Sequence, residues 1–325
     1  MPFRICSIGC GGMSSSGHGP AFARYAAAHE DTLLAACCDL DAVKAHAYAQ
    51  RFGFARYYTD IDEMLRRERP DAVALIVPVQ LTAALSVKLL RAGFPVIMEK
   101  PPGLNAEETN RIIDAAAQSG TPHMVSFNRR HMPLVRAFRE MEAGHSPSHL
   151  QYDFYRVGRT DADFSTTAIH GIDTTRFLAG SDYREVHLNY APQSGYPDRV
   201  RNIYLDCTFV NGATARITFC PVSGLLAERC TAHMEDAAIE GCFPIFGSFD
   251  LPGRVVRIER GKITDIRAAD PAEGAYYNNG FYGENAVFFD AIRAGFAPVD
   301  TAASGLQTVV IADAIRQGLD TVVFP

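Results

Sequence analysis

A glycine turn near the N-terminus could hold a phosphate group. The apolar residues 5–8 predict a buried strand, and Gly9, Gly11 and Gly12 follow it directly. Gly9 permits a tight turn, and Gly11 lets the backbone approach a pyrophosphate whose charge lies at the N-terminus of the next helix. Ser14 stands where the usual fingerprint has its third glycine. The turn by itself is therefore a weak signal for a dinucleotide site.

A carboxylate after the second predicted strand makes a dinucleotide site the better interpretation. Asp39 lies roughly 20 residues beyond the turn, where an acidic side chain accepts hydrogen bonds from the adenosine ribose. The alternative is that Asp39 only forms a turn and that Asp41 only caps the next helix. A ribose 2′-phosphate would need a nearby cation, and Lys44 is the only Lys or Arg close to Asp39 in the sequence. The pattern therefore predicts NAD as the cofactor, with NADP less favoured.

Charged side chains follow the fourth predicted strand, which ends at Met98. Glu99 and Lys100 come directly after it, and Pro101 follows them. Side chains at the carboxyl end of a parallel strand face the ligand crevice of an open α/β sheet. An ordinary ion pair at the surface is the alternative, and these residues taken alone favour it.

His170 could exchange a proton near neutral pH, where unperturbed imidazole titrates. It lies near the start of a predicted helix over residues 168–179, and Asp173, three residues further on, shares its face. A histidine on a helix is more often a structural hydrogen-bonding group than a base. His18, close to the glycine turn, is interpreted as a residue at a helix start.

The elements that position these residues alternate regularly up to residue 127. Short apolar runs bounded by turn residues are typical of parallel strands buried on both faces. These runs cover residues 5–8, 33–38, 72–77, 95–98 and 123–127. Helix patterns between them cover residues 20–28, 41–51, 60–69, 82–91 and 106–119. The alternation predicts an NAD(P)-binding Rossmann domain over residues 1–127, with a doubly wound parallel sheet.

Beyond residue 127 the pattern changes to strands joined by turns such as Asn211-Gly212, which suggest hairpins. Strand-like stretches cover residues 150–157, 185–190, 201–210, 214–220, 231–240 and 254–259. Helix patterns cover residues 133–142, 168–179, 284–294 and 301–317. The sequence therefore predicts a second, α+β domain over residues 128–325, with a mostly antiparallel sheet flanked by helices.

Composition argues against several classes of protein. Of 325 residues, 47% are hydrophobic and 21% are charged, which is typical of a globular chain and not of a disordered one. A net charge of −6 argues against a nucleic-acid partner. There is no apolar stretch long enough to cross a membrane and no signal-peptide pattern, so we expect a cytoplasmic protein without a membrane partner. The eight cysteines lack zinc-type spacing, and no metal site is expected.

Further motifs occur in order along the chain. They are Cys38-Asp39, Asp71-Ala72-Val73, Val77-Pro78, Glu99-Lys100-Pro101, Phe127-Asn128-Arg129-Arg130, His170-Gly171-Ile172-Asp173 and Gly280-Phe281-Tyr282. With the glycine turn, this ordered set resembles the glucose-fructose oxidoreductase/inositol dehydrogenase/MocA (Gfo/Idh/MocA) oxidoreductase family over essentially the whole chain. The resemblance implies a Rossmann domain followed by a substrate-binding and oligomerisation domain. That second domain would carry a large open antiparallel sheet, whose broad face commonly forms homodimers or homotetramers.

The resemblance also implies roles for particular residues. Lys100 would be the catalytic lysine that reaches the substrate hydroxyl beside the nicotinamide, and Pro101, often cis in this family, would aim it. His170 would be the acid–base residue. The loop at Val77-Pro78 would border the nicotinamide. The implied cofactor contacts are Gly9, Gly11, Gly12, Met13, Asp39, Val77, Pro78, Glu99, Lys100 and Pro101.

One position departs from the family pattern. The family usually carries an aspartate four residues before the histidine, where this chain has Thr166. The carboxylate of the usual Lys, Asp and His trio is therefore missing, although Asp161 or Asp163 could reach in from the preceding loop. We expect activity to be retained, altered in substrate or lost. The candidate substrate contacts are Asn128, Arg129, Tyr155, Thr166 and Asp173. Asn128 and Arg129 lie just past the end of the fifth predicted strand, and an ion pair between the domains is the alternative for Arg129 or Arg130.

The sequence thus predicts an NAD(P)-dependent dehydrogenase or reductase acting on CH–OH groups. It would transfer a hydride between nicotinamide and a carbinol or carbonyl carbon of a sugar, cyclitol or related polyol. One alternative is a dinucleotide-binding regulator or scaffold without turnover, which Thr166 favours and the retained Lys100 and His170 oppose. Another is a hydrolase or lyase that uses NAD for transient oxidation, as some members of the resembled family do.

Overall fold

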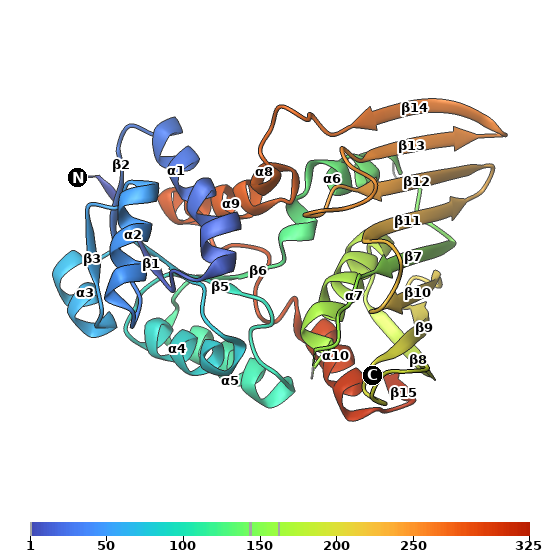
Figure 1. Cartoon of the computed structure of the whole chain (residues 1–325), viewed down its shortest axis with the longest axis horizontal. Helices are drawn as coiled ribbons and strands as arrows, with labels where there is room; N and C mark the ends of the chain where they lie inside the picture. The colour runs from blue at the N-terminus through green and yellow to red at the C-terminus, as the bar shows by residue number, and fades with distance from the viewer. Residues whose placement is uncertain (1, 143–144, 162) are drawn as a thin grey trace. The chain divides into compact units, whose positions relative to one another are not determined.

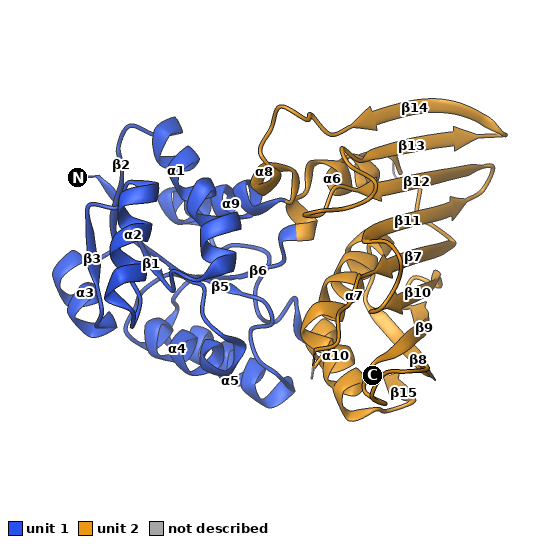
Figure 2. Cartoon of the chain, viewed as in Figure 1, with its two compact units in different colours: residues 1–128, 280–306 blue, residues 129–279, 307–325 orange. Residues whose placement is uncertain are grey.

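The computed structural model describes residues 2–142, 145–161 and 163–325. The chain forms two compact units, which Figure 2 colours separately. Unit 1 comprises residues 1–128 and 280–306, and unit 2 comprises residues 129–279 and 307–325. In the described ranges, no helix is both long enough and apolar enough to cross a membrane.

Unit 1 is built on sheet A, which has the strand order β3-β2-β1-β4-β5-β6. The strands are β1 (Phe3–Ile8), β2 (Thr32–Cys38), β3 (Arg56–Tyr58), β4 (Ala72–Leu75), β5 (Val96–Glu99) and β6 (His123–Ser126). Neighbouring strands all run parallel. The order reverses between β1 and β4, and sheets of this kind bind ligands beside the carboxyl ends at such a switch point. The predicted doubly wound parallel sheet is confirmed.

Helices accompany these strands in unit 1, and capping side chains mark the start of some of them. They are the π-helix η1 (Ser14–His18), α1 (Gly19–Ala28), α2 (Ala42–Phe52), α3 (Ile61–Glu68), α4 (Val79–Arg91), α5 (Ala106–Ser119) and α9 (Phe281–Ala294). The Asp41 carboxylate accepts hydrogen bonds from the N–H groups of Val43 and Lys44, and the Asn105 side chain accepts one from Glu108. Such acceptors satisfy N–H groups that the first turn of a helix leaves without a partner.

The core of unit 1 is formed by two segments that lie far apart in the sequence. Phe22 and Tyr25 of α1 are buried with Phe288 and Phe289 of α9, against one face of sheet A. The ring centroids of Tyr25 and Phe289 lie 5.1 Å apart. Helix α9 therefore completes the core that the N-terminal segment begins, and it lies beside α1 in Figure 1.

Unit 2 is built on sheet B, which has the strand order β14-β13-β12-β11-β7-β10-β9-β8-β15. The strands are β7 (His149–Tyr155), β8 (Tyr183–Pro192), β9 (Arg201–Phe209), β10 (Thr214–Cys220), β11 (Ala227–Met234), β12 (Ala237–Phe243), β13 (Arg254–Glu259), β14 (Lys262–Ala268) and β15 (Thr321–Val323). β7 and β10 pair in parallel, and the remaining neighbours are antiparallel. The predicted mostly antiparallel sheet with helices is confirmed.

The remaining helices carry several of the predicted site residues, His170 among them. They are η2 (Asn128–His131), α6 (Pro133–Met141), α7 (Ser165–Ala179), α8 (Ala275–Asn278) and α10 (Leu306–Gln317). α7 packs against β7 and β10, and α6 against β12, β13 and β14 (Figure 1). A Cβ on Gly171 would lie 2.8 Å from the Phe219 ring, so glycine is what permits α7 to approach the sheet this closely. His170 is thereby held on a helix packed firmly against β10.

Some predicted elements are wrong in extent. The single strand predicted over residues 231–240 is two strands, because the chain turns at Asp236, which has φ 55°. The helix predicted over residues 301–317 begins at Leu306. The sequence does not predict β3, β14, β15, η1 or α8. β14 has no buried residue, so it lacks the apolar alternation by which strands are recognised.

The predicted functional division, with a cofactor-binding domain over residues 1–127 and a substrate-binding domain over residues 128–325, stays a prediction. The structure adds that the chain returns to unit 1 at Gly280 and leaves it again after Leu306. A periodicity pattern identifies α9 as a helix but does not indicate the sheet against which it packs.

Candidate active site

The glycine turn after β1 needs glycine at its first position. Gly9 has φ 94°, and a Cβ on it would lie 1.9 Å from the carbonyl oxygen of Ile76. Its N–H group donates to the carbonyl oxygen of Cys38 at 2.8 Å. Glycine adopts such positive φ values without steric cost. The turn is therefore held tightly between the ends of β2 and β4.

Asp39 is fixed beside this turn by backbone hydrogen bonds. Its Oδ2 accepts from the N–H group of Cys10 at 2.9 Å, and its Oδ1 accepts from that of Asp41 at 3.0 Å. The side chain is half-buried and lines the same cavity as Gly9 and Gly11. An anionic acceptor at the end of the second strand is the group that binds ribose hydroxyls in this kind of fold.

A cavity of about 550 Å³ adjoins the turn in unit 1. Apolar side chains such as Leu40, Ile61 and Leu81 form much of its lining, and the predicted contacts Val77 and Pro78 line it too. There is no described atom within 4 Å of a Cβ built on Gly11, so a larger residue there would project into this space. Apolar walls, one carboxylate and an uncovered glycine backbone fit the adenosine and phosphate parts of a dinucleotide.

Lys100 follows directly after β5, and its side chain is half-buried. The Lys100–Pro101 peptide bond is cis, as the resemblance implies. The preceding Glu99 is buried, and both of its carboxylate oxygens have partners. Oε2 accepts from the N–H group of Lys100 at 3.0 Å, and Oε1 lies 2.9 Å from Nε2 of His18. A buried pair with His18 therefore replaces the surface ion pair that was the alternative at this strand end.

Glu99 is ionised in this setting. Burial raises the pKa of its carboxyl group, but the hydrogen bond from His18 and the charge of Lys100 lower it, so the pKa lies below its usual value. His18 ends η1 and is 1% exposed. The interpretation of His18 as a helix-start residue missed this contact, because nothing in the sequence connects position 18 with position 99.

In unit 2, His170 contacts Arg129. Nη1 of Arg129 lies 3.2 Å from Nε2 of His170. A guanidinium group only donates, so Nε2 is the unprotonated nitrogen of the imidazole in this pair. Nε and Nη2 of Arg129 donate to the Glu228 carboxylate at 3.2 Å and 2.8 Å. Arg129 is thus fixed from one side and presents its remaining nitrogen to His170.

Glu228 collects several donors in the interior of unit 2. It is fully buried, accepts from the Tyr152 hydroxyl at 3.0 Å and pairs with Arg156. Burial raises the pKa of Glu228, but the charges and hydrogen bonds of Arg129 and Arg156 lower it to about 2. The sequence does not predict Glu228 as a site residue. It lies in β11, which begins at Ala227, upstream of the strand predicted from residue 231.

Asp173 has a partner that explains its burial. The Arg130 guanidinium donates to its two oxygens at 2.8 Å and 2.6 Å, and the Thr308 hydroxyl lies 3.3 Å from Oδ1. Asp173 is 1% exposed. These contacts tie α7 to η2 and α10, and they favour a structural role for Asp173 over the predicted substrate contact.

The loop before α7 does not bring a carboxylate to His170 in the contacts described. Oδ1 of Asp163 accepts from the N–H and hydroxyl groups of Ser165 at 2.9 Å and 2.5 Å. Asp161 pairs with an arginine of the same loop at 2.6 Å. The Thr166 hydroxyl donates to the carbonyl oxygen of Asp163 at 3.2 Å. These bonds stabilise the first turn of α7.

The contacts described do not join Tyr155 or Asn128, two further predicted substrate contacts, to His170. Phe154 faces α7, since it lies near Gly171, and successive strand residues point to opposite faces of a sheet. Tyr155 therefore lies on the face of sheet B turned away from α7, and the structure does not bring it together with His170. Asn128 is buried and is the last residue of the first segment of unit 1.

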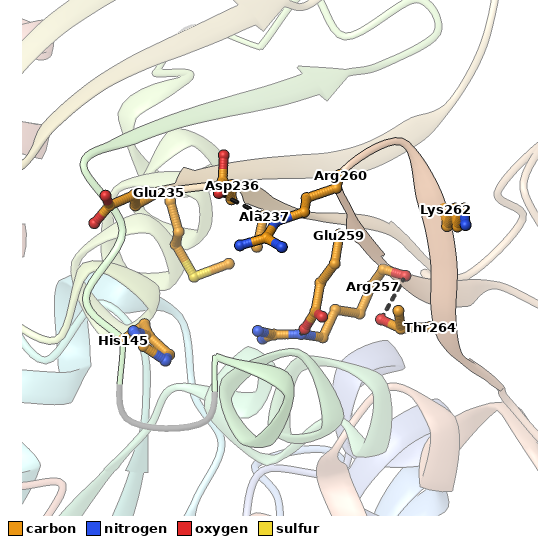
Figure 3. A pocket seen from close by; sticks show the side chains of 10 residues that line it. His145, Glu235, Asp236, Ala237, Arg257, Glu259, Arg260, Lys262 and Thr264 are labelled. Atoms are coloured by element: carbon orange, nitrogen blue, oxygen red, sulfur yellow. Dashed lines mark hydrogen bonds and ion pairs between the residues drawn. The ribbon is translucent and has the colours of Figure 1, made fainter.

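A larger cavity of about 680 Å³ lies in unit 2, beside the ends of β11, β12, β13 and β14. Arg260 pairs with Asp236 at 3.2 Å, and Arg257 pairs with Glu259 at 2.7 Å (Figure 3). The lining of this cavity includes none of the predicted site residues. In the part of the chain that the structure describes, no group of His, Cys, Asp and Glu side chains is arranged to hold a metal ion.

The segment that contains the glycine turn matches a known protein family. Residues 3–127 match the model of the Gfo/Idh/MocA oxidoreductase family, described as having an NAD-binding Rossmann fold. Over these residues, the chain is similar to the Rossmann domain of that family. The resemblance predicted from the ordered motifs is confirmed.

Curated relatives match part of the chain. It is 30% identical to D-glucoside 3-dehydrogenase of Escherichia coli (strain K12) over 139 residues, which cover 43% of this chain and 38% of that protein. It is 27% identical to inositol 2-dehydrogenase of Corynebacterium glutamicum (strain R) over 200 residues, which cover 59% of this chain and 58% of that protein. The match thus spans only about half the length of these relatives.

Solved structures match nearly the whole chain. A dehydrogenase from Chromobacterium violaceum has a TM-score of 0.85 and 21% identity, covering 98% of this chain and 95% of its own. A levoglucosan dehydrogenase in complex with NADH and levoglucosan has a TM-score of 0.82 and 20% identity, with 100% of both chains covered. These likenesses show that both units share their fold with dehydrogenases.

Proposed function

We propose that this protein is an NAD-dependent dehydrogenase or reductase that acts on a CH–OH group of a sugar, cyclitol or related polyol. The observation that carries the proposal is the cavity beside Gly9 and Gly11, with Asp39 at its edge, in a chain whose residues 3–127 match an NAD-binding oxidoreductase family. The names of the curated relatives, a glucoside dehydrogenase and an inositol dehydrogenase, support this substrate class.

The preference for NAD over NADP follows from the charges around Asp39. A carboxylate that accepts ribose hydroxyls repels a 2′-phosphate. Lys44, the nearest cation along the chain, lies 3.6 Å from the Asp41 carboxylate, and both side chains are exposed. Lys44 is therefore already paired with a carboxylate that would also repel an additional phosphate.

Lys100 would act on the substrate oxygen. Bound NAD supplies the hydride acceptor, or bound NADH the donor. The Lys100 ammonium group has three N–H donors and a full charge, so it can stabilise the negative charge that develops on a hydroxyl oxygen as its proton leaves. The buried Glu99 carboxylate fixes the backbone of Lys100 and keeps a compensating negative charge next to it.

His170 would exchange the proton of the substrate hydroxyl. Its Nε2 is unprotonated in the pair with Arg129, as a general base requires. We infer that the hydroxyl replaces the Arg129 guanidinium as the partner of Nε2 when substrate binds. Arg129, held by Glu228, would remain close enough to interact with the substrate oxygen.

An absorbance assay tests the proposal. Purified protein is mixed with NAD and a panel of sugars and cyclitols, and the appearance of reduced nicotinamide is followed. We expect turnover with at least one polyol, and a fall of roughly 10²- to 10⁴-fold in His170→Asn, which preserves shape and removes titration. Wild-type protein that binds NAD but gives no net reduction with any member of the panel would contradict the proposal.

A dinucleotide-binding protein without turnover is the second candidate. Thr166 favours it, because a hydroxyl stands where the family usually has a carboxylate. NAD-assisted hydrolysis or elimination is distinguished by product formation without net reduction of NAD.

Assembly as a homodimer or homotetramer and a cytoplasmic location stay predictions. Light scattering of the purified chain tests the first, and cell fractionation tests the second.

A further inference from the structure

We propose that His18 and Asn285 are positioning residues that fix the Glu99 carboxylate and, through it, the backbone of Lys100. The inference rests on the role proposed above for Lys100. It adds two side chains that stand outside the predicted site, and all four residues belong to unit 1.

His18 connects polar side chains from distant parts of unit 1. Its Nε2 lies 2.9 Å from Oε1 of Glu99, and its Nδ1 lies 3.1 Å from Nδ2 of Asn285. The exposed fractions are 1% for His18, 9% for Glu99 and 0% for Asn285. η1, β5 and α9 supply one residue each. Inside a protein such bonds are strong, and leaving one of these groups unpaired costs free energy.

The Asn285 amide determines which nitrogen of His18 carries the proton. Nδ2 of Asn285 also donates to the carbonyl oxygen of Phe281 at 2.7 Å. A carbonyl oxygen only accepts, so this end of the amide is the NH₂ group. It therefore donates to Nδ1 of His18, and the proton of the neutral ring is on Nε2. That N–H group donates to Glu99, so the hydrogen bonds run in one direction from α9 to the carboxylate.

Glu99 transmits this constraint to Lys100. While Oε1 is held by His18, Oε2 accepts from the N–H group of Lys100 at 3.0 Å. With both oxygens engaged, the orientation of the carboxylate and the position of the Lys100 backbone are fixed together. A displacement of Glu99 would therefore move the amine that the proposed reaction needs.

Packing fixes His18 in the same place. The rings of His18 and Phe281 meet edge to face with centroids 5.1 Å apart. A Cβ on Gly17 would lie 2.9 Å from the Phe281 ring, so glycine lets η1 approach α9. η1 begins at Ser14, directly after the glycine turn. One short segment thus connects the phosphate-binding turn with the anchor of Lys100.

Two substitutions at position 18 separate positioning from packing. His18→Gln keeps an amide N–H group near the place of Nε2, whereas His18→Asn keeps a polar group near Nδ1 and removes the donor to Glu99. We expect kcat for polyol oxidation to fall on the order of 10- to 100-fold in His18→Asn, because small displacements of a reacting group have effects of this size. In His18→Gln, kcat should stay within about threefold, and in both variants KM and the Kd of NAD should change by less than about threefold.

A second readout does not depend on turnover. The full chain is treated with a trace of acetic anhydride, and acetylation of Lys100 is measured by mass spectrometry relative to the exposed Lys44 and Lys262. We expect the relative reactivity of Lys100 to change by about threefold or more in His18→Asn and to stay near the wild-type value in His18→Gln, because the charge next to the ammonium is displaced only in the first. Wild-type protein without dehydrogenase activity would contradict the proposed function, and the labelling result would still decide this inference.

If His18→Asn does not fold, Asn285→Leu is used in its place to test the same inference. Leucine has a similar volume but cannot select the tautomer of His18, and we expect changes of kcat and Lys100 labelling in the same direction and of smaller size. Wild-type kcat and labelling in a folded His18→Asn or Asn285→Leu variant would overturn the inference. A lowered melting temperature with both readouts unchanged would assign the network to packing alone and would overturn it equally.

Discussion

Nη1 of Arg129 lies 3.2 Å from Nε2 of His170 and donates a hydrogen bond to it. The cation therefore opposes protonation of the nitrogen that would act as the base. Through Glu228, Arg129 is connected to Tyr152 and Arg156. Asp173 is paired with Arg130, and Glu228 is shared by Arg129 and Arg156.

Replacing Arg129 by methionine should shift the pH dependence of the reaction. Removal of the cation makes protonation of His170 easier, so the midpoint of the rise in oxidation rate with pH should move upward by about one unit. The rate at neutral pH should fall accordingly. The pH profile of kcat/KM measures this. The control is Arg216→Met, which removes from β10 an arginine that pairs with Asp206 of β9. An unshifted midpoint would mean that Arg129 does not influence the base.

Lys100→Met should reduce chemistry more than cofactor binding. Methionine has a similar length but no charge and no donor, and loss of a positioned electrostatic group should lower kcat by about 10²-fold or more. The Kd of NAD, measured by fluorescence titration, should stay within about threefold. Lys262→Met, a substitution in exposed β14, is the matched control. Normal turnover in Lys100→Met would remove Lys100 from the mechanism.

Thr166→Asp should restore the carboxylate that the family usually carries. If its side chain points toward His170, an anion there stabilises the imidazolium, and the midpoint of the pH–rate profile should rise by about one unit. Thr166→Asn has the same shape without the charge and should leave the midpoint unchanged. Identical profiles for the two variants would show that position 166 does not face the base.

Asp39→Ala should narrow the preference for NAD over NADP. Wild-type protein should bind NAD more tightly, since the Asp39 carboxylate accepts ribose hydroxyls and repels a 2′-phosphate. Calorimetric titration of both cofactors gives the ratio of their Kd values, which should fall by about tenfold or more in the variant. Asp114→Ala, which removes an exposed carboxylate of α5, is the control and should preserve the ratio. Tighter binding of NADP by the wild type would refute the assignment.

His123 should make the protein less stable in acid. Burial lowers the pKa of this imidazole to about 4, and its Nε2 accepts a hydrogen bond from the N–H group of Ala302 at 3.1 Å. The folded chain thus holds the proton less tightly than the unfolded chain, whose histidine titrates near pH 6.5. The stabilisation that comes from the neutral His123 is fully present above that pH. The free energy of unfolding should fall by about 3 kcal/mol as the pH decreases from about 6.5 to about 4.

Urea unfolding at pH 7 and pH 4.5 tests this expectation. His123→Gln keeps an acceptor for Ala302 but does not titrate, so it should lose less stability between the two pH values than the wild type. Equal losses in the two proteins would assign the acid sensitivity to other groups.

Periodicity predicts the fold well where strands are buried. β1, β2, β4, β5 and β6 are mostly apolar, and their burial on both faces is what makes such strands recognisable. β14 is exposed and β3 has only three residues, so neither leaves a pattern. The turn at Asp236 interrupts one apolar stretch without a glycine or proline to mark it.

The candidate site was predictable only where its residues are sequential motifs. The glycine turn, Asp39 and Lys100 follow strand ends, which the sequence locates. Glu228 and His18 act through partners about 100 and 80 residues away, and no local pattern encodes such pairings. Asp173 shares the face of α7 with His170 by helical spacing, yet its partner is Arg130.

The return of the chain to unit 1 has a consequence for synthesis on the ribosome. Residues 1–128 emerge first, but the buried rings of Phe288 and Phe289 belong to their core. The nascent N-terminal segment must therefore keep an uncovered apolar surface on α1 until about 160 further residues have been translated, which at common elongation rates takes on the order of ten seconds. Chaperones that bind exposed apolar segments have that interval in which to act, and a gene truncated after residue 128 would leave the surface uncovered permanently.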